Sequence, residues 1–287
     1  MPIQTTGVAY TDDDLDELAP SPYRTNGERL LWFLRRTVLA DLHADDLVRR
    51  LAVCSAAVER EHYFATALQD IVGFNAVSRL VISARWALQR LDGAALVENY
   101  VRSAVINELL IDYGQITPIY HYVMAAAQAS VTGVSTSLRR EIYEAHGLAC
   151  YSCGVQLDRH SSDDKNSATI EHLWPQSLGG DSDFRNLLPA CRACNTNRNE
   201  HADWPAFWFQ SCFLAPRPSE EAIERAVSLR TRVALQFFRA YLAAEDTGMS
   251  LKRSLLVAGP LPAPDVSERD FATDFFSIVA YEEKVQL

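Results

Sequence analysis

The chain has 287 residues, of which 48% are apolar, and its formal net charge is −10. This length allows about two domains, and the apolar content is sufficient for a sizeable core. The acidity argues against a protein that grips nucleic acid unaided, because such binding is largely neutralisation of phosphates.

The first 26 residues differ from the rest of the chain in composition. They contain an acidic run at residues 11–17 and three prolines. Such a segment is poor in core-forming residues, so we expect residues 1–26 to be an acidic leader that is flexible or lightly docked. The acidic run could also cover a basic nucleic-acid groove, and the sequence does not choose between these two roles.

Residues 27–135 have the apolar periodicity of helices and predict a helical domain. Leu31, Leu34 and Val38 recur at helical spacing, and a second such set lies between residues 47 and 58. Asp92-Gly93 interrupts the pattern, which predicts a boundary between two helices at that point.

The stretch 113–138 contains no Asp, Glu, Lys or Arg and therefore raises the question of a membrane span. Its proline, its glycines and its many polar residues favour a buried core helix instead. We accordingly predict no membrane association. Because the N-terminus shows no secretory signal, we expect a cytoplasmic protein.

Two Cys-x-x-Cys pairs mark the middle of the chain, Cys150 with Cys153 and Cys191 with Cys194. Four thiolates from two such pairs complete the tetrahedral sphere of a structural Zn²⁺ site. Gly154 follows the first pair and can adopt the positive φ that a tight knuckle favours. The alternatives are two disulfides, which need an oxidising compartment, or four unrelated core cysteines. A closed four-cysteine site has no open coordination position, so this zinc would support folding and not catalysis.

The segment between the two pairs predicts short strands and turns. The apolar run 168–170 leads into Glu171-His172 and predicts a strand, which ends near the following proline because proline has no N–H to donate. Gly179-Gly180 predicts a tight turn. Residues 186–189 predict a second strand, and Asn195 is expected to begin a helix because asparagine and threonine are good N-caps.

This segment resembles the HNH endonucleases, whose ββα-metal fold combines these elements in this order. The matching residues are Glu171-His172, Pro175-Gln176-Ser177, Gly179-Gly180, Asn186-Leu187, and Cys191 and Cys194 followed by Asn195 and Arg198. The resemblance covers residues 137–200, including the helix before the first cysteine pair. It implies a mainly α protein with helical N- and C-terminal regions that flank a small zinc-stapled ββα-metal module at residues 136–204.

The resemblance also implies a role for each matching polar residue. His172 would be the general base that takes a proton from the attacking water. Glu171 and Asn195 would bind one Mg²⁺ or Mn²⁺ ion, which would stabilise the leaving oxygen of a DNA phosphodiester. Asn186 would hold the loop of the base in position. Arg198 would contact phosphate.

Two residues depart from the commonest family pattern. Glu171 stands where aspartate is usual and is one methylene longer, which can shift the metal or change the metal preference. Asn195 stands where histidine is common, and its amide oxygen favours magnesium over a softer ion.

Residues 205–287 predict a C-terminal helical region. An aromatic cluster at residues 204–209 is expected to pack against a neighbouring domain rather than stack on bases. A helix is expected from about residue 219 to about residue 244, followed by a proline-rich connector and an apolar tail that should dock on the body or on a partner.

Two functions remain compatible with the sequence. The first is a metal-dependent HNH endonuclease that cuts DNA, in bacterial defence or DNA processing. The second is a non-catalytic zinc module in a helical interaction protein. Residues 137–204 hold seven Lys/Arg against ten Asp/Glu. We therefore expect weak intrinsic DNA affinity and activation or delivery by a partner protein. The chain has no P-loop, dinucleotide-binding or HExxH motif.

Overall fold

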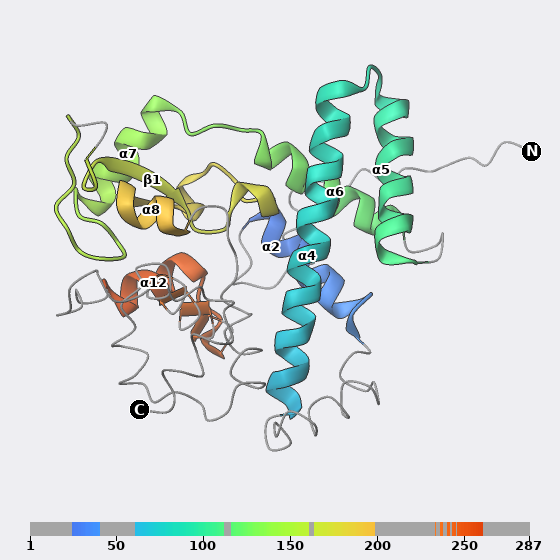
Figure 1. The fold of residues 1–287 in the computed structure, drawn as a ribbon, viewed down its shortest axis with the longest axis horizontal. Helices are drawn as coiled ribbons and strands as arrows, with labels where there is room; N and C mark the ends of the chain where they lie inside the picture. Colours follow the sequence, from blue (N-terminus) through green and yellow to red (C-terminus); the bar gives the residue numbers. More distant parts are fainter. Residues whose placement is uncertain are drawn as a thin grey trace, which may run out of the picture.

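Figure 1 shows a computed structural model of the chain, which describes residues 25–40, 61–111, 116–160, 164–198 and, with internal gaps, 233–260. The described part is mostly helical and contains one small two-stranded antiparallel sheet, which confirms the predicted fold class. The elements are α2 (Asn26–Arg36), α4 (Glu61–Arg90), α5 (Ala94–Leu109), α6 (Ile116–Ser130), α7 (Thr136–His146), β1 (Ala168–His172), η4 (Gln176–Leu178), η5 (Phe184–Asn186), β2 (Leu187–Cys191), α8 (Arg192–Arg198) and α12 (Leu251–Ala258).

Helices α2, α4, α5 and α6 pack together, and we call them the helical body. The long helix α4 contacts the other three, and α2 also contacts α6 (Figure 1). The break predicted at Asp92-Gly93 is confirmed, because α4 ends at Arg90 and α5 begins at Ala94. The core of the body consists of aliphatic side chains at helical spacing, including Leu30, Leu31, Leu34, Val77, Leu80, Val81, Val101, Val105, Ile119 and Val123.

The start of α2 is fixed by a capping box. The Thr25 hydroxyl accepts a hydrogen bond from the Glu28 amide at 3.1 Å, and the Glu28 carboxylate accepts one from the Thr25 amide at 2.8 Å. Each bond satisfies an amide at the helix start that has no intrahelical acceptor. The cap matters for the site because residues 26 and 27, which follow it, contact residues 181 and 179 of the HNH-like segment, as we call residues 136–204.

Helix α6 is a buried core helix, as its uncharged sequence predicted. Ile119, Val123, Ala126 and Ala127 are buried among the other helices of the body. Within the described residues, one stretch is long and apolar enough to cross a membrane by length and composition alone, at residues 69–90 of α4. This stretch supplies Val77, Leu80 and Val81 to the core, as the central helix of a bundle would.

The HNH-like segment contains the predicted two strands and a helix. Strands β1 and β2 pair antiparallel with His172 opposite Leu187, and α7 and α8 lie against this sheet. The turn at Gly179 is present, with φ of 79° after the short helix η4.

The predicted start of α8 at Asn195 is wrong by three residues, because the helix begins at Arg192. The physical reason is the cysteine knuckle. The sulfur of Cys191 accepts a hydrogen bond from the Cys194 amide at 3.3 Å, which is the i to i+3 bond of an N-cap. A cysteine side chain therefore takes the capping role that asparagine was expected to fill.

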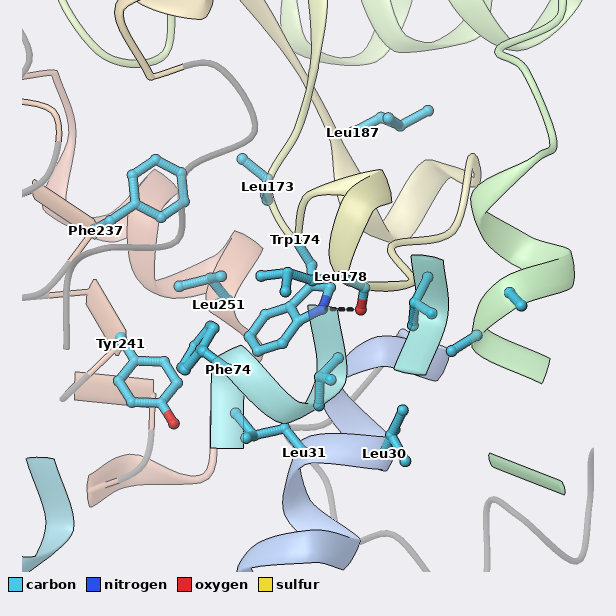
Figure 2. Packing of buried hydrophobic residues seen from close by; sticks show 14 of the residues in the cluster. Leu30, Leu31, Phe74, Leu173, Trp174, Leu178, Leu187, Phe237, Tyr241 and Leu251 are labelled. Atoms are coloured by element: carbon cyan, nitrogen blue, oxygen red, sulfur yellow. Dashed lines mark hydrogen bonds between the residues drawn. The ribbon is translucent and has the colours of Figure 1, made fainter. Parts of the chain in front are cut away.

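The loop at residues 173–182, which we call the histidine loop because it follows His172, is packed into the helical body. Trp174 is buried, its ring lies 5.1 Å from that of Phe74 in α4, and its indole nitrogen donates to the Leu178 carbonyl at 2.9 Å (Figure 2). The Gly27 amide of α2 donates to the Gly179 carbonyl at 2.9 Å. The loop and the first turn of α2 are therefore in direct contact.

The C-terminal region contributes α12 and part of a preceding helix to the described residues. Phe237 stacks edge-on against Tyr151 of the HNH-like segment, and Lys252 of α12 donates to the Phe184 carbonyl. The leader before residue 25, the periodic set at 47–58, the aromatic cluster at 204–209 and the apolar tail lie outside the described residues. The predicted domain boundaries remain predictions.

Replacing Gly27 with alanine should destabilise the protein although alanine is the better helix former. A Cβ at this position would overlap the Leu178 carbonyl oxygen and the Trp174 indole. Overpacking of this kind costs about 1–3 kcal/mol, which exceeds the gain of up to about 1 kcal/mol from helix propensity. The measurement is urea unfolding. Gly133→Ala is the matched control, because a Cβ there would meet nothing within 4 Å, and its free energy of unfolding should change little. A stabilised Gly27→Ala protein would contradict the packing described here.

Candidate active site and metal centre

The four cysteines converge on one point between the two knuckles. Their Sγ atoms all lie within 4.8 Å of one another, and none forms a disulfide. The Sγ atoms of Cys153 and Cys191 are 3.8 Å apart. Tetrahedral zinc with Zn–S bonds of about 2.3 Å requires sulfurs about 3.8 Å apart, so the geometry fits Zn²⁺. The two-disulfide alternative does not fit sulfurs that are this far apart.

The local backbone holds the first knuckle in the shape that metal binding needs. Gly154 has a φ of 75°, as predicted, and its amide donates to the Cys150 carbonyl at 2.8 Å. Hydrogen bonds from neighbouring thiols, first of all Cys153, lower the pKa of Cys150 below its ordinary range. Neighbouring thiols, first of all Cys150, raise the pKa of Cys191 and Cys194 instead, so the cluster favours one thiolate and a bound cation would be needed to stabilise the others.

His172 lies at the end of β1, and one of its ring nitrogens forms a hydrogen bond. Its Nε2 is 2.8 Å from the Ser182 hydroxyl oxygen. That hydroxyl donates a hydrogen bond to the Thr132 carbonyl, which follows the end of α6, and accepts one from the Gln176 side-chain amide at 3.2 Å. Because the Ser182 proton is directed at Thr132, the hydroxyl oxygen accepts from His172. The imidazole is therefore protonated on Nε2, and Nδ1 is the nitrogen that can accept a proton.

The surroundings of His172 keep the ring neutral. Burial, assisted by the positive charge of Arg198, lowers the pKa of His172 to about 4. Both effects disfavour the imidazolium form. At pH 7 the ring can accept a proton, although its basicity is lower than that of a free histidine.

Asn186 fastens the histidine loop from within. Its Oδ1 accepts from the Trp174 amide at 2.7 Å, and its Nδ2 donates to the carbonyls of Trp174 at 3.0 Å and Asp181 at 2.9 Å. The side chain is buried, so each of these bonds is made away from water. One amide thus joins the two ends of the loop that follows His172.

Glu171 points to the opposite face of β1 and is buried with Arg198. The Arg198 guanidinium donates to Oε1 of Glu171 and to the carbonyls of His172, at 2.6 Å, and Leu173. The Phe237 ring covers one face of the guanidinium, and its centroid lies 3.9 Å from Cζ of Arg198. Burial raises the pKa of Glu171 to about 7, against the lowering effect of Arg198. In this arrangement Arg198 is directed at protein oxygens in the interior, whereas the sequence predicted a phosphate contact.

Two oxygens at this face are suited to a hard cation. Oε2 of Glu171 is buried without a hydrogen-bond partner. Asn195 donates through Nδ2 to the Thr169 hydroxyl at 3.0 Å and to the Ile170 carbonyl at 3.4 Å, so its Oδ1 is directed away from the strand. A carboxylate oxygen and an amide oxygen are ligands that Mg²⁺ and Mn²⁺ accept. The predicted ligand pair therefore fits a divalent ion in its chemistry.

Four cysteines positioned to bind a metal are joined here to a two-strand and helix unit, with an acid-His pair at the end of the first strand, and this is the arrangement of a ββα-metal module. Residues 150–207, about a fifth of the chain, match the family model described as HNH endonuclease. This match confirms the family resemblance that the motifs indicated. The chain matches no curated protein and no solved structure.

Sequence reasoning missed the contact between Ser182 and His172. A serine in a polar loop carries no signal of its own, and its second partner, Thr132, lies 50 positions earlier in the chain. The glycine pair at 179–180 indicated a turn, and only the folded turn brings Ser182 back to the ring.

The purified protein should contain one zinc ion per chain, and Cys153→Ser should abolish its retention. Losing one thiolate leaves a site that is open to water, and the energy of metal binding is part of the folding energy of such modules. Native mass spectrometry measures the zinc content, and thermal unfolding measures the stability. Gln156→Ala, an exposed change beside the same knuckle, should retain the metal. A Cys153→Ser protein that keeps its zinc would contradict the four-sulfur assignment.

The depressed pKa of His172 predicts a pH-dependent loss of stability. Between its ordinary pKa of 6.5 and its folded pKa of about 4, the unfolded chain binds a proton that the folded chain does not. Stability from this group is therefore present above pH 6.5 and is lost as the pH falls toward 4. Glu171 acts with the opposite sign, since its raised pKa favours the folded state below about pH 7.

Comparison of wild type with His172→Gln isolates the histidine contribution. Between pH 6.5 and 4.5 the wild type should lose about 2–3 kcal/mol relative to the variant. Urea unfolding at each pH measures this difference, and NMR titration of the ring gives the pKa directly. A His172 that titrates near pH 6.5 would refute the buried, neutral assignment.

Proposed function

We propose that the protein is a metal-dependent HNH endonuclease that hydrolyses DNA phosphodiester bonds, with His172 as the general base. The observation that carries the proposal is the contact of 2.8 Å between Nε2 of His172 and the Ser182 hydroxyl, from which we infer the tautomer of the ring. Its Nε2 is held by Ser182, which leaves Nδ1 as the proton acceptor. A general base must present an unprotonated nitrogen at a defined position, and this ring does so next to an acidic residue in an HNH-family segment.

Each residue of the site has a defined part in this mechanism. Nδ1 of His172 accepts a proton from the attacking water. Asn186 and Ser182 keep the ring and its loop in place, which reduces the entropy cost of positioning the base. Glu171 and Asn195 would hold one Mg²⁺ or Mn²⁺ ion. That ion, when bound, neutralises charge on the phosphate and stabilises the leaving oxygen.

Arg198 has a different part from the one first expected. Because its guanidinium donates to Glu171 and to two backbone carbonyls, it fixes the carboxylate and the end of β1. We propose that it is a positioning residue. Binding of a divalent ion at Glu171 would then add a second positive charge close to Arg198, so the affinity for the ion should be modest.

The biological setting is a further part of the proposal. A net charge of −10 supports weak intrinsic DNA affinity and dependence on a partner protein that delivers or activates the nuclease. A cytoplasmic role in bacterial defence or DNA processing fits such control. The same acidity favours the alternative function, a non-catalytic zinc module in a partner-binding protein, and cleavage separates the two.

Wild-type protein should nick supercoiled plasmid in the presence of Mg²⁺ or Mn²⁺, and His172→Ala should reduce the rate by about 10²–10⁴-fold, as loss of a general base does. Gel analysis of the plasmid measures the rate, and omission of the divalent ion is the metal control. His160→Ala is the matched control, because His160 is exposed in the loop before β1 and should not affect cleavage. Equal cleavage by wild type and His172→Ala would refute the assignment of the base. Absence of cleavage by a folded, zinc-loaded wild type would favour the binding-module function.

A further inference from the structure

A basic hollow lies at the surface of the HNH-like segment, separate from the residues assigned so far. It has an open volume of about 330 Å³ and is lined by Thr136, Ser137, Arg139, Arg140 and Arg159. The first four come from the beginning of α7, and Arg159 comes from the loop before β1. All five side chains are exposed and therefore accessible to a large ligand.

The charge at this hollow contrasts with the acidity of the chain. Residues 137–204 contain seven Lys/Arg, and three of these line the hollow. Within the described part of the chain, no carboxylate pairs with Arg139 or Arg159, and Arg140 has only a long, exposed contact of 3.8 Å with Glu144. Arg159 lies 5.4 Å from the centre of the Tyr143 ring, a contact that uses no N–H donor. The three guanidinium groups thus have donors available for an anion.

The other cations of the segment are already engaged. Arg198 is buried against Glu171, and Arg185 pairs with Asp183 at 2.9 Å. Lys165 and Arg192 also have interactions within the protein. Among the described residues of the segment, the arginines at the hollow therefore have no carboxylate within 3.5 Å, whereas Arg198 is paired with Glu171.

The hollow is connected to the candidate active site through a short stretch of chain. The Thr132 carbonyl accepts from Ser182, which holds His172, and Thr136 follows only four residues later. Four residues span at most about 14 Å, so the hollow begins within about 14 Å of that carbonyl. On DNA, which carries one phosphate per strand for each 3.4 Å of axis, this upper bound corresponds to about four phosphates.

We propose that Arg139, Arg140 and Arg159 form a phosphate-binding site that holds the DNA backbone a few nucleotides away from the bond to be cut. Guanidinium groups bind phosphate oxygens as paired donors, and the hydroxyls of Thr136 and Ser137 add further donors. This site rests on the proposed nuclease function. The site gives an acidic protein a local basic surface for DNA. Because it contacts phosphates and not bases, it carries no sequence preference.

The test is DNA binding without cleavage. Fluorescence anisotropy with a 30-base-pair duplex at 50 mM salt compares three full-length proteins in the His172→Ala background. They are the otherwise unchanged chain, the double variant Arg139→Gln/Arg159→Gln, and the control Arg90→Gln. Arg90 is exposed at the end of α4, in the helical body. The slope of log affinity against log salt should become less steep by about 2 in the double variant, because each lost phosphate contact removes about 0.9, and at 50 mM salt this corresponds to binding that is about 100-fold weaker.

The outcomes separate this proposal from the proposed function. Unchanged affinity and salt slope in the double variant would overturn the phosphate site. A loss of about 10-fold in Arg90→Gln, half of the loss in the double variant on a logarithmic scale, would overturn it too, because it would indicate an equal effect of any removed positive charge. Absence of measurable binding by the unchanged chain would also overturn it. None of these results decides whether the wild type cleaves plasmid. If the wild type cleaves plasmid while the binding test overturns the arginine site, His172 remains the base and only the arginine site is rejected. Circular dichroism checks that the double variant is folded.

Discussion

Burial of the histidine loop in the helical body is the constraint on which the rest of the site depends. Trp174 is almost fully buried, and a tryptophan that leaves water contributes about 4–6 kcal/mol at 25 cal/mol per Å². The hydrogen bond between Gly27 and Gly179 adds about 1 kcal/mol. Burial of the indole therefore contributes most of the stability of this contact, and the hydrogen bonds fix the register in which the loop docks. Because the loop begins next to His172, the same packing sets where the imidazole lies.

The other side of the site is held by different forces. The cysteine cluster anchors the first knuckle and β2, and β2 fixes β1 through the antiparallel ladder. Glu171 and His172 are consecutive residues of β1, so they face opposite sides of the sheet. One side chain is buried with Arg198 toward α8, and the other faces Ser182 in the loop. Arg198 lowers the pKa of His172 and partly offsets the raised pKa of Glu171, which links the two faces electrostatically.

The sequence predicted the parts of the site that depend on local spacing. The cysteine pairs, the strand ending at the acid-His pair and the glycine turn follow from residues close together in the chain. The start of α8 was not predicted, because cysteine is not among the residues that usually cap a helix N-terminus. The burial of Arg198 depends on Phe237, which lies 39 positions later, and no local pattern announces that contact. The docking of Trp174 on Phe74 joins residues 100 positions apart and likewise required the folded structure.

The histidine loop and the helical body are packed as one cooperative unit, and amide hydrogen exchange tests this most directly. The amides of Gly27, Trp174 and Gly180 donate to partners at 2.9 Å, 2.7 Å and 3.0 Å and report on the two sides of the contact. We predict that they exchange with the same opening free energy as the core amides of α4, because the loop opens only when the body unfolds. Fast exchange in the loop beside a protected α4 would show that the histidine loop moves independently, and that result would contradict the account.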